Sequence, residues 1–428
     1  MAVLQGRNRA QLRQSVGYNL GAIYVSSPSG TGESDGSTIV DNTLIGGDDN
    51  YIGKWVVFTD ASASTVQTTR VSDYDSSNTK LTVAPSLSAQ SATADSYELW
   101  DDIYPPARIE EFINQSITDA TGAFYDPVEN ISIHTDGNSQ RYDIPTGLAM
   151  IQNIYYRSSV DFIRLHACAS TFDETEDAEF TQALDIKDKK QGTQSLKITL
   201  SASAEADDVI ADSITSVNLS GYDMVEMWVK STVATSAGNL KLHLDSAKIT
   251  EATAHASQTD EALPIDALSA DKWTFVRMSL NNPESDTAIV SIALEQDADL
   301  GACTIWLDDI SVVKNDSAQW EKLPRNLWRI EKEEQDIILD NYAHGMARYN
   351  LLKLVGGDVP ALLTADTSTN ELDEQYIISR STALAFASAS GGPNTDPDNK
   401  NNMAGFWMGM SSSARRAFPL LTDVRMVK

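Results

Sequence analysis

Hydrophobic residues recur with helical spacing at both ends of the chain. In residues 3–22, Leu4, Leu12, Val16 and Leu20 follow one another at steps of four or eight residues, with arginines between them. Such spacing gives a helix with one apolar side. The same period predicts further helices over 106–123, 341–355, 371–389 and 402–417. The last residues, 418–428, have no helical stripe and predict an extended arm.

Between these ends the pattern changes to that of strands. Residues 23–100 hold short segments rich in β-branched and aromatic residues, separated by Gly, Ser, Asp and Asn. This predicts a small antiparallel barrel or sandwich. Residues 166–315 consist almost entirely of such segments, and their regular spacing predicts a β-sandwich. Its clearest strands are 195–202, 224–231, 240–246, 273–280 and 303–313.

The order of these regions predicts one domain inserted into another. A domain can be inserted where the chain leaves the host domain and returns to it at exposed positions that lie close together. We therefore expect an α+β multidomain protein with a discontinuous helical-bundle/β core, a small β-barrel-like module and an inserted all-β sandwich. The expected bounds are 1–22, 101–165 and 316–428 for the core, 23–100 for the module and 166–315 for the sandwich.

The chain is strongly acidic. Its net charge is −29 over 428 residues, and residues 166–315 hold 26 acidic but only 10 basic side chains. An acidic surface repels the phosphate backbone, which excludes general nucleic-acid binding through a basic face. No segment approaches the ~20 apolar residues of a membrane helix, and the N-terminus has no apolar signal core. We expect synthesis in a cytoplasm and no membrane partner.

Motifs of common enzymes do not occur in the sequence. It has no G-x-x-x-x-G-K, G-x-G-x-x-G or H-E-x-x-H, and its five histidines lack the spacing of a zinc site. We therefore expect no catalysis. Catalytic carboxylates need not be close in sequence, so a polysaccharide-degrading enzyme stays an alternative. Cys168 and Cys303 are either reduced and buried or form one bridge, and a chain of this size needs no bridge to build a core.

The regions outside the all-β block resemble head-to-tail adaptor (connector) proteins of tailed bacteriophages. The carrying segments are RAQLRQSVGYNLG (9–21), RYDIPTGLAMIQNIYYR (141–157), WEKL (320–323) and LLKLVGGDVPALL (351–363). The resemblance implies a structural virion protein that forms a homo-oligomeric ring, a dodecamer, in the neck. Its partners would be the portal protein and the tail and head-completion proteins. The protein itself would be synthesised in the host cytoplasm. DNA would pass through the channel without specific binding.

The all-β block resembles the jelly-roll domains of carbohydrate-binding modules. The resemblance is carried by Gly192 with SLKI (195–198), LSGYDMVEMWVKS (219–231), DKWTFVRMSL (271–280) and TIWLDDISV (304–312). It implies a jelly roll that either binds a glycan or decorates the particle. It also implies a structural calcium ion.

The calcium ligands implied by this resemblance are carboxylates near the two ends of the block. Asp308 and Asp309 close the last strand, and Asp173 and Glu174 come from the first. Calcium needs six to eight oxygen ligands, of which a sequence shows only the carboxylates. Solvated surface acids remain the alternative in such an acidic domain.

Two tryptophans are the candidates for glycan binding. Trp228 alternates with Val225, Met227 and Val229, and Trp306 alternates with its hydrophobic neighbours, so each points away from the predicted core. Aromatic faces stack on sugar rings, but most such residues are packing anchors. Both interpretations stay open. Trp273 is expected in the core.

The sequence thus leaves three hypotheses. The first is a ring-forming adaptor with an outward-facing sandwich that is decorative or binds glycans weakly. The second is a receptor-binding or tail-fibre-like protein that recognises host-surface glycans. The third is the enzyme mentioned above. Arg7, Arg9, Arg13 and three C-terminal arginines would either dock an acidic neighbour such as a portal ring or balance nearby carboxylates.

Overall fold

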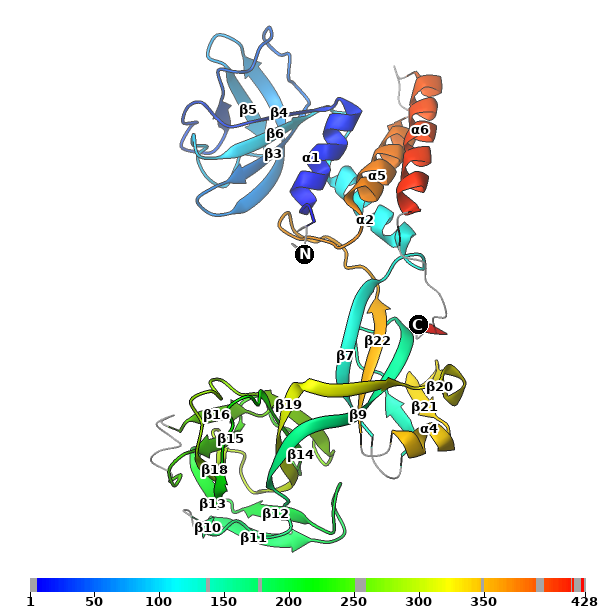
Figure 1. The fold of residues 1–428 in the computed structure, drawn as a ribbon. Coiled ribbons are helices and arrows are strands. Elements are labelled where there is room, and N and C mark those ends of the chain that lie inside the picture. Colours follow the sequence, from blue (N-terminus) through cyan, green and yellow to red (C-terminus); the bar gives the residue numbers. More distant parts are fainter. Residues whose placement is uncertain are drawn as a thin grey trace. The chain divides into compact units, whose positions relative to one another are not determined.

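A computed structural model describes residues 6–135, 139–175, 179–250, 259–347, 350–389, 396–416, 418 and 425–426. The chain divides into two compact units (Figure 1). The first unit contains Met1–Pro127 and Gly357–Asp423, and the second contains Val128–Gly356 and Val424–Lys428.

The first unit contains a six-stranded antiparallel sheet. Its strands are β1 (Ile23–Ser26), β2 (Thr38–Val40), β3 (Trp55–Asp60), β4 (Thr65–Asp75), β5 (Lys80–Ala84) and β6 (Ser96–Trp100). They lie in the order β1-β6-β3-β4-β5-β2. One core is formed where alternate side chains such as Val56, Phe58, Leu81 and Tyr97 meet. Alternation places one face of the sheet in this core, and on the other face Val57 and Trp100 pack into a second core shared with the helices.

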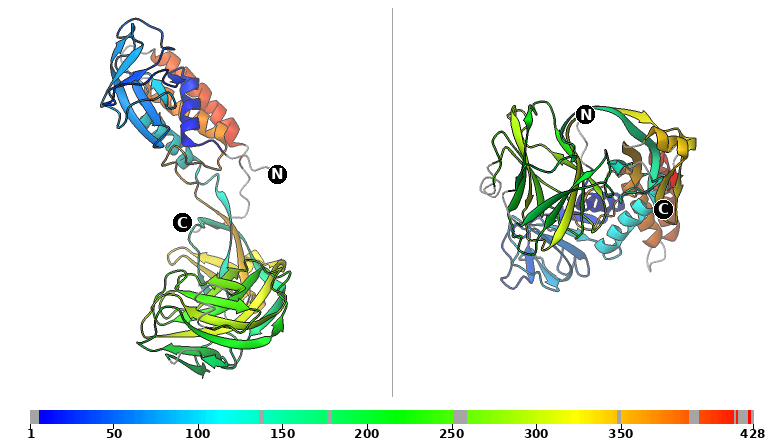
Figure 2. Two further views of the ribbon diagram at one scale, coloured as in Figure 1. Left: turned by 90° about the vertical axis from the view of Figure 1, so that its left-hand side faces the viewer. Right: turned by 90° about the horizontal axis from the view of Figure 1, so that it is seen from below.

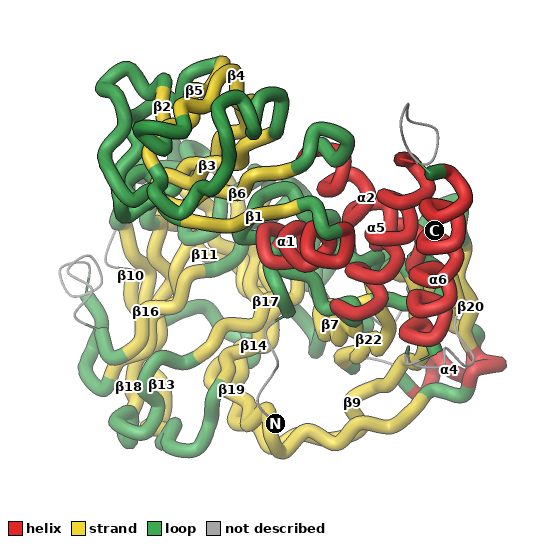
Figure 3. Tube along the Cα trace, turned by 90° about the horizontal axis from the view of Figure 1, so that it is seen from above, coloured by secondary structure: helices red, strands yellow, loops and turns green. Residues whose placement is uncertain are grey.

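Helices of the same unit pack against one another (Figure 3). They are α1 (Arg9–Leu20), α2 (Pro106–Ala120), α5 (Glu374–Ala389) and α6 (Pro397–Arg415). α1 begins at Asn8, which forms a capping box with Gln11 and so satisfies backbone N–H groups at the helix start. The apolar stripe of α2 packs against α5, and both share a core with Leu12 and Val16 of α1.

A buried ionic network fastens α1 to its neighbours. Arg13 is 1% exposed and makes ion pairs with Glu98 of β6, Glu110 of α2 and Asp366. Arg9 pairs with the same Glu110 and Asp366. The arginines of this segment therefore balance carboxylates of their own chain, which was one of the two interpretations of the sequence.

The second unit contains a β-sandwich (Figure 2). One layer, the front sheet, consists of five strands of a nine-stranded sheet, and the other, the back sheet, is a separate five-stranded sheet. The front sheet is β11 (Phe180–Asp185), β12 (Ser195–Leu200), the first part of β19 (Cys303–Lys322), β14 (Met224–Ser231) and β17 (Thr274–Ser279). The back sheet is β10 (Glu174–Thr175), β13 (Asp208–Val217), β18 (Ile289–Gln296), β15 (Leu240–Asp245) and β16 (Glu261–Pro264). Side chains of both sheets, among them Val225, Met227, Ile292 and Leu294, form one core. The predicted β-sandwich is confirmed.

Two long strands connect the sandwich with a second core in this unit. β9 (Met150–His166) and β19 run antiparallel, from the pair His166 and Ile310 to the pair Tyr155 and Lys322. The chain therefore reaches the sandwich and leaves it along hydrogen-bonded neighbours.

The second core lies among the strands beyond the sandwich. β22 (Leu351–Asp358), β7 (Asp126–His134) and the short β23 (Arg425–Met426) extend the sheet of β9. A three-stranded sheet of β20 (Trp328–Glu331), β21 (Asp336–Leu339) and β8 (Arg141–Asp143) lies beside α4 (Asn341–Met346) and the 3-10 turn η1 (Arg325–Leu327). Of the predicted C-terminal arm, only Phe418 and β23 fall within the described residues.

The expected fold class, an α+β protein built on a helical-bundle core, is wrong. Strands make up 40% of the protein and helices 18%, and the strands form several sheets. The clearest error is the helix predicted over 341–355, because α4 ends at Met346 and β22 begins at Leu351. Leu351 and Leu352 point to opposite faces of β22 and both are buried, as is Leu354. A strand that is buried on both faces contains a continuous run of apolar residues. The spacing of hydrophobic residues alone does not distinguish such a run from a buried helix.

Both cysteines are buried, and neither is in a disulfide. Burial raises the pKa of the Cys303 thiol to about 11 and that of Cys168 still further. Among the described helices, none has the length and apolar character required to cross a membrane.

Candidate functional site

The outer face of the front sheet carries two neighbouring rows of side chains. Strand alternation sends Val225, Met227 and Val229 of β14 into the core and leaves Glu226 and Trp228 on the outer face. The register of the paired strands determines which residues lie beside Glu226 and Trp228 on the neighbouring strands. The aromatic row consists of Phe275 and Trp228, with Asp308 opposite Trp228 on β19. The polar row consists of Arg277, Glu226, Ser311 and Arg164 on β17, β14, β19 and β9.

A histidine from outside the sandwich packs on the aromatic row. The ring centroid of His134, at the end of β7, lies 4.3 Å from that of Phe275 and 5.0 Å from that of Trp228. Burial lowers the pKa of His134 to about 4, so the ring is neutral at pH 7. The indole Nε1–H of Trp228 is buried, and no described residue accepts a hydrogen bond from it. A buried hydrogen-bond donor without an acceptor is rare in folded proteins. Where one occurs, it is explained by a bound ligand, a water molecule or local strain.

An open groove of about 570 Å³ runs along this row. Trp228, Trp273, Phe275 and Lys190 line it from the sandwich, and His134 and Tyr142 line it from the neighbouring strands. Lys190 places its ammonium 5.0 Å from the Trp228 ring centroid. The Nε1–H of Trp273 donates to Asp188 at 2.6 Å, which fixes the orientation of that ring. Trp273 therefore lies at the groove and is not the core residue that the sequence suggested.

Ion pairs order the polar row. Arg157 of β9 makes two parallel hydrogen bonds of 2.8 and 2.7 Å to the carboxylate of Glu226, and Arg277 donates to the same carboxylate at 2.9 Å. Burial raises the pKa of Glu226, but the two guanidinium groups outweigh it and hold that pKa below its usual range. A bidentate pair of this kind fixes side-chain geometry as well as charge.

A second cavity, of about 360 Å³, lies over the polar row. We call it the arginine cavity, because Arg157 and Arg164 line it together with Glu226, Asp309 and Ser311. His134 and Phe275 line both this cavity and the groove. The two hollows therefore adjoin at these rings.

Trp306 lies on the same outer face but does not line either hollow. It is 8% exposed, and the ammonium groups of Lys230 and Lys197 lie 4.9 and 5.6 Å from its ring centroid. Its indole N–H donates to Asp185 at 3.2 Å. Of the two tryptophans predicted to bind a glycan, only Trp228 therefore lines the groove.

The acids predicted to bind calcium do not gather. Oδ2 of Asp308 accepts hydrogen bonds from the backbone N–H groups of Lys190 and Gln191, and Asp309 pairs with Arg164 at 2.7 Å. Asp173 directly precedes β10 and accepts a hydrogen bond from the backbone N–H of Ser213. The side chain of Glu174 lies outside the described residues. Nitrogen donors thus engage one oxygen of Asp308, of Asp309 and of Asp173, and the calcium site stays a prediction.

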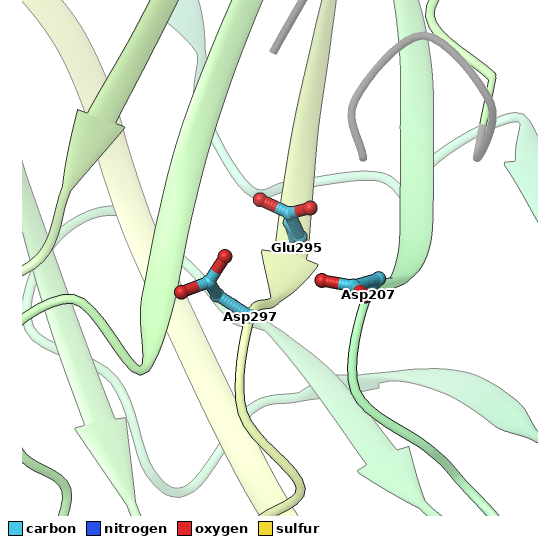
Figure 4. Close-up of side chains that lie close together, drawn as sticks. All are labelled: Asp207, Glu295 and Asp297. Atoms are coloured by element: carbon cyan, nitrogen blue, oxygen red, sulfur yellow. The ribbon is translucent and has the colours of Figure 1, made fainter. Parts of the chain in front are cut away.

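A different group of acids does come together at the edge of the back sheet. Asp207, Glu295 and Asp297 have carboxylate oxygens within 4.8 Å of one another (Figure 4). The ammonium of Lys241 pairs with Asp297 and lies 3.7 Å from Glu295. His243 also contacts Glu295, at 2.8 Å. A side-chain cation thus supplies counter-charge to this cluster.

No protein-family model matches the chain. No curated protein matches it either. Solved structures that are similar in part include a CBM29-2 carbohydrate-binding module variant in complex with mannohexaose, at 9% identity and a TM-score of 0.22, covering 36% of this chain and 93% of the other. Another is the CBM22-1 xylan-binding domain from Paenibacillus barcinonensis, at 16% identity and a TM-score of 0.26, covering 36% and 96%. Values this low say nothing about a ligand of this chain.

Sequence reasoning missed several residues of this face. His134 reaches the aromatic row from a strand outside the sandwich, so no local pattern connects it with Trp228. Phe275 and Arg277 were detectable in principle, because they alternate with the buried Val276 and Met278 in the segment 273–280. The partners across the strands depend on register, which spacing does not give.

Proposed function

We propose that the protein binds a glycan without catalysis, in the groove along the aromatic row. The observation that carries this proposal is the indole N–H of Trp228, a residue that lines the groove: this N–H is buried and has no hydrogen-bond partner among the described residues. A sugar hydroxyl supplies the acceptor that this donor needs. Satisfying it recovers part of the penalty of about 1–3 kcal/mol that an unpaired buried polar group carries.

The other groups of the groove suit the same ligand. Aromatic rings such as Trp273 and Phe275 offer apolar faces to the C–H surface of a pyranose, while polar tips remain for its hydroxyls. The volume of about 570 Å³ lies in the range of ligand sites for small molecules. The side chains are held in place by β14, β17 and the hydrogen bond from Trp273 to Asp188, so little ordering is required on binding.

A glycan array followed by isothermal titration calorimetry tests the proposal. We expect saturable binding of at least one oligosaccharide by the wild type. Replacement Trp273→Ala should weaken it about thirtyfold, as loss of ~2 kcal/mol from a central aromatic contact requires. The matched control is Trp320→Ala, a half-buried tryptophan on β19 that does not line the groove. Equal affinities of the two variants, or no binding by the wild type, would contradict the proposal.

A second proposal concerns assembly as a head-to-tail adaptor in a virion neck. It is supported by two exposed apolar residues one turn apart on α6, Phe406 at 57% and Met410 at 39% exposure. The helix also has Asp398 in its first turn and Arg415 and Arg416 at its end, so its two ends complement each other between copies. Electron microscopy with portal present should show a twelve-copy ring, and monomers alone would count against it.

A further inference from the structure

The arginine cavity contains hydrogen-bond donors that the protein does not use. The Oγ of Ser311 is buried, with 6% of the residue exposed, and has no hydrogen-bond partner in the part of the chain that the structure describes. Arg164 uses its Nε for the ion pair with Asp309, and its two Nη groups have no partner among the described residues. Its side chain is 48% exposed, so these groups are accessible from solvent.

The rest of the cavity holds these donors in place. Ser311 lies between Glu226 and Arg164 in the register of the sheet, so its hydroxyl and the Arg164 guanidinium belong to one row. Arg157 is held by its two hydrogen bonds to Glu226 and is largely buried. The two acids of the lining, Glu226 and Asp309, are each already engaged by a guanidinium.

An acceptor with two oxygens in one plane fits such donors better than a single hydroxyl does. A guanidinium presents parallel N–H groups that match a carboxylate in a bidentate manner, and charge-assisted hydrogen bonds of this kind are about twice as strong as neutral ones. The cavity adjoins the groove at His134 and Phe275. One saccharide chain is therefore able to occupy both hollows.

We infer that the ligand is an acidic oligosaccharide, and that the arginine cavity binds the carboxylate of a uronic acid residue through Arg164 and Ser311 while a neighbouring sugar lies on Trp273. This inference rests on the proposed function and adds the class of glycan. It also explains how an acidic protein attracts an acidic ligand, because the contact is made by a fixed local pair of donors and not by the net charge.

The test compares three oligosaccharides of equal length by isothermal titration calorimetry: oligogalacturonate, neutral mannohexaose and a sulfated hexasaccharide. We expect oligogalacturonate to bind the wild type at least tenfold tighter than mannohexaose. This difference in affinity should decrease as the salt concentration is raised from 50 to 500 mM, because salt screens exposed charges. Tighter binding of the sulfated probe than of oligogalacturonate would overturn the carboxylate assignment.

Variants connect this preference to the cavity. Arg164→Gln and Ser311→Ala should each remove most of the tenfold preference and leave mannohexaose affinity unchanged, and Arg164→Lys should restore only part of it. Arg108→Gln on α2 is the control, since it loses the same charge from an exposed ion pair outside the cavity. If mannohexaose binds as tightly as oligogalacturonate, the inference fails while the proposed function stands. If none of the glycans binds, both fail.

Discussion

Trp228 and Asp308 lie opposite each other on β14 and β19, and each keeps one buried polar atom without a hydrogen-bond partner among the described residues. On Trp228 this atom is the indole Nε1, and on Asp308 it is the carboxylate Oδ1. Both lie on the outer face of the front sheet, away from the hydrophobic core between the two sheets. Unsatisfied groups of this kind cost stability and persist at sites that serve a ligand.

The buried carboxylate of Asp308 should make stability depend on pH. Burial raises its pKa from 3.8 to about 6, so the folded state prefers the protonated form. The associated stability is present below pH 4 and is lost as the pH rises from about 4 to 6. Relative to Asp308→Asn, the wild type should lose up to about 3 kcal/mol of unfolding free energy between pH 4 and 7.

Urea unfolding of both proteins at several pH values measures this difference. The exposed Asp102→Asn serves as the control and should follow the wild type. A gap between wild type and Asp308→Asn that does not widen with pH would refute the assignment.

The Arg13 network should be essential for the first unit. Arg13→Ala leaves Glu98 without its buried counter-charge and Asp366 with Arg9 alone, and loss of one partner from a buried pair costs about 3–5 kcal/mol. Arg7→Ala removes an exposed pair with Glu374 and should cost less than about 1 kcal/mol. Thermal unfolding followed by circular dichroism compares them. Similar losses for the two variants would be inconsistent with the network.

Trp306 provides a test that separates stability from binding. Its ring is buried beneath Lys230 and Lys197 and does not line the groove. Trp306→Ala should therefore destabilise the sandwich by about 3–5 kcal/mol and leave glycan affinity per folded molecule unchanged. A loss of affinity as large as that of Trp273→Ala would restore the prediction that Trp306 contacts the ligand.

Calcium should distinguish the wild type from a lysine variant. In the wild type the ammonium of Lys241 neutralises part of the cluster formed by Asp207, Glu295 and Asp297. Calcium should not change its melting temperature, whereas Lys241→Ala should gain stability on calcium addition, because a bound ion stabilises the folded state. Differential scanning calorimetry measures both. Stabilisation of the wild type by calcium would revive the calcium prediction made from the sequence.

Local patterns were sufficient for the parts of the fold that depend on one strand or helix. The alternation in 224–231 predicted that Trp228 leaves the core, and the apolar stripe of 106–123 predicted α2. Residues 351–355 were wrongly predicted as helix because three leucines of β22, Leu351, Leu352 and Leu354, are all buried. Nothing in a local window distinguishes that environment from a helix core.

The candidate site was predicted only in part for a related reason. Trp228 was identified from its own strand, but its partners His134 and Asp308 are distant in sequence and meet it through register and packing. The arginine cavity combines Arg164 of β9 with Ser311 of β19, and neither residue is unusual by itself. Such a pair becomes visible only when the strands are placed side by side.

The central claim is that a glycan occupies the groove beside Trp228 and Trp273. The most direct measurement is a titration of the ¹⁵N-labelled protein with oligosaccharide, followed by the indole Nε1–H signals in nuclear magnetic resonance spectra. The account predicts that the signals of Trp228 and Trp273 shift and saturate together, while those of Trp306 and Trp320 stay in place. Shifts confined to other tryptophans, or no shift with any glycan, would contradict it.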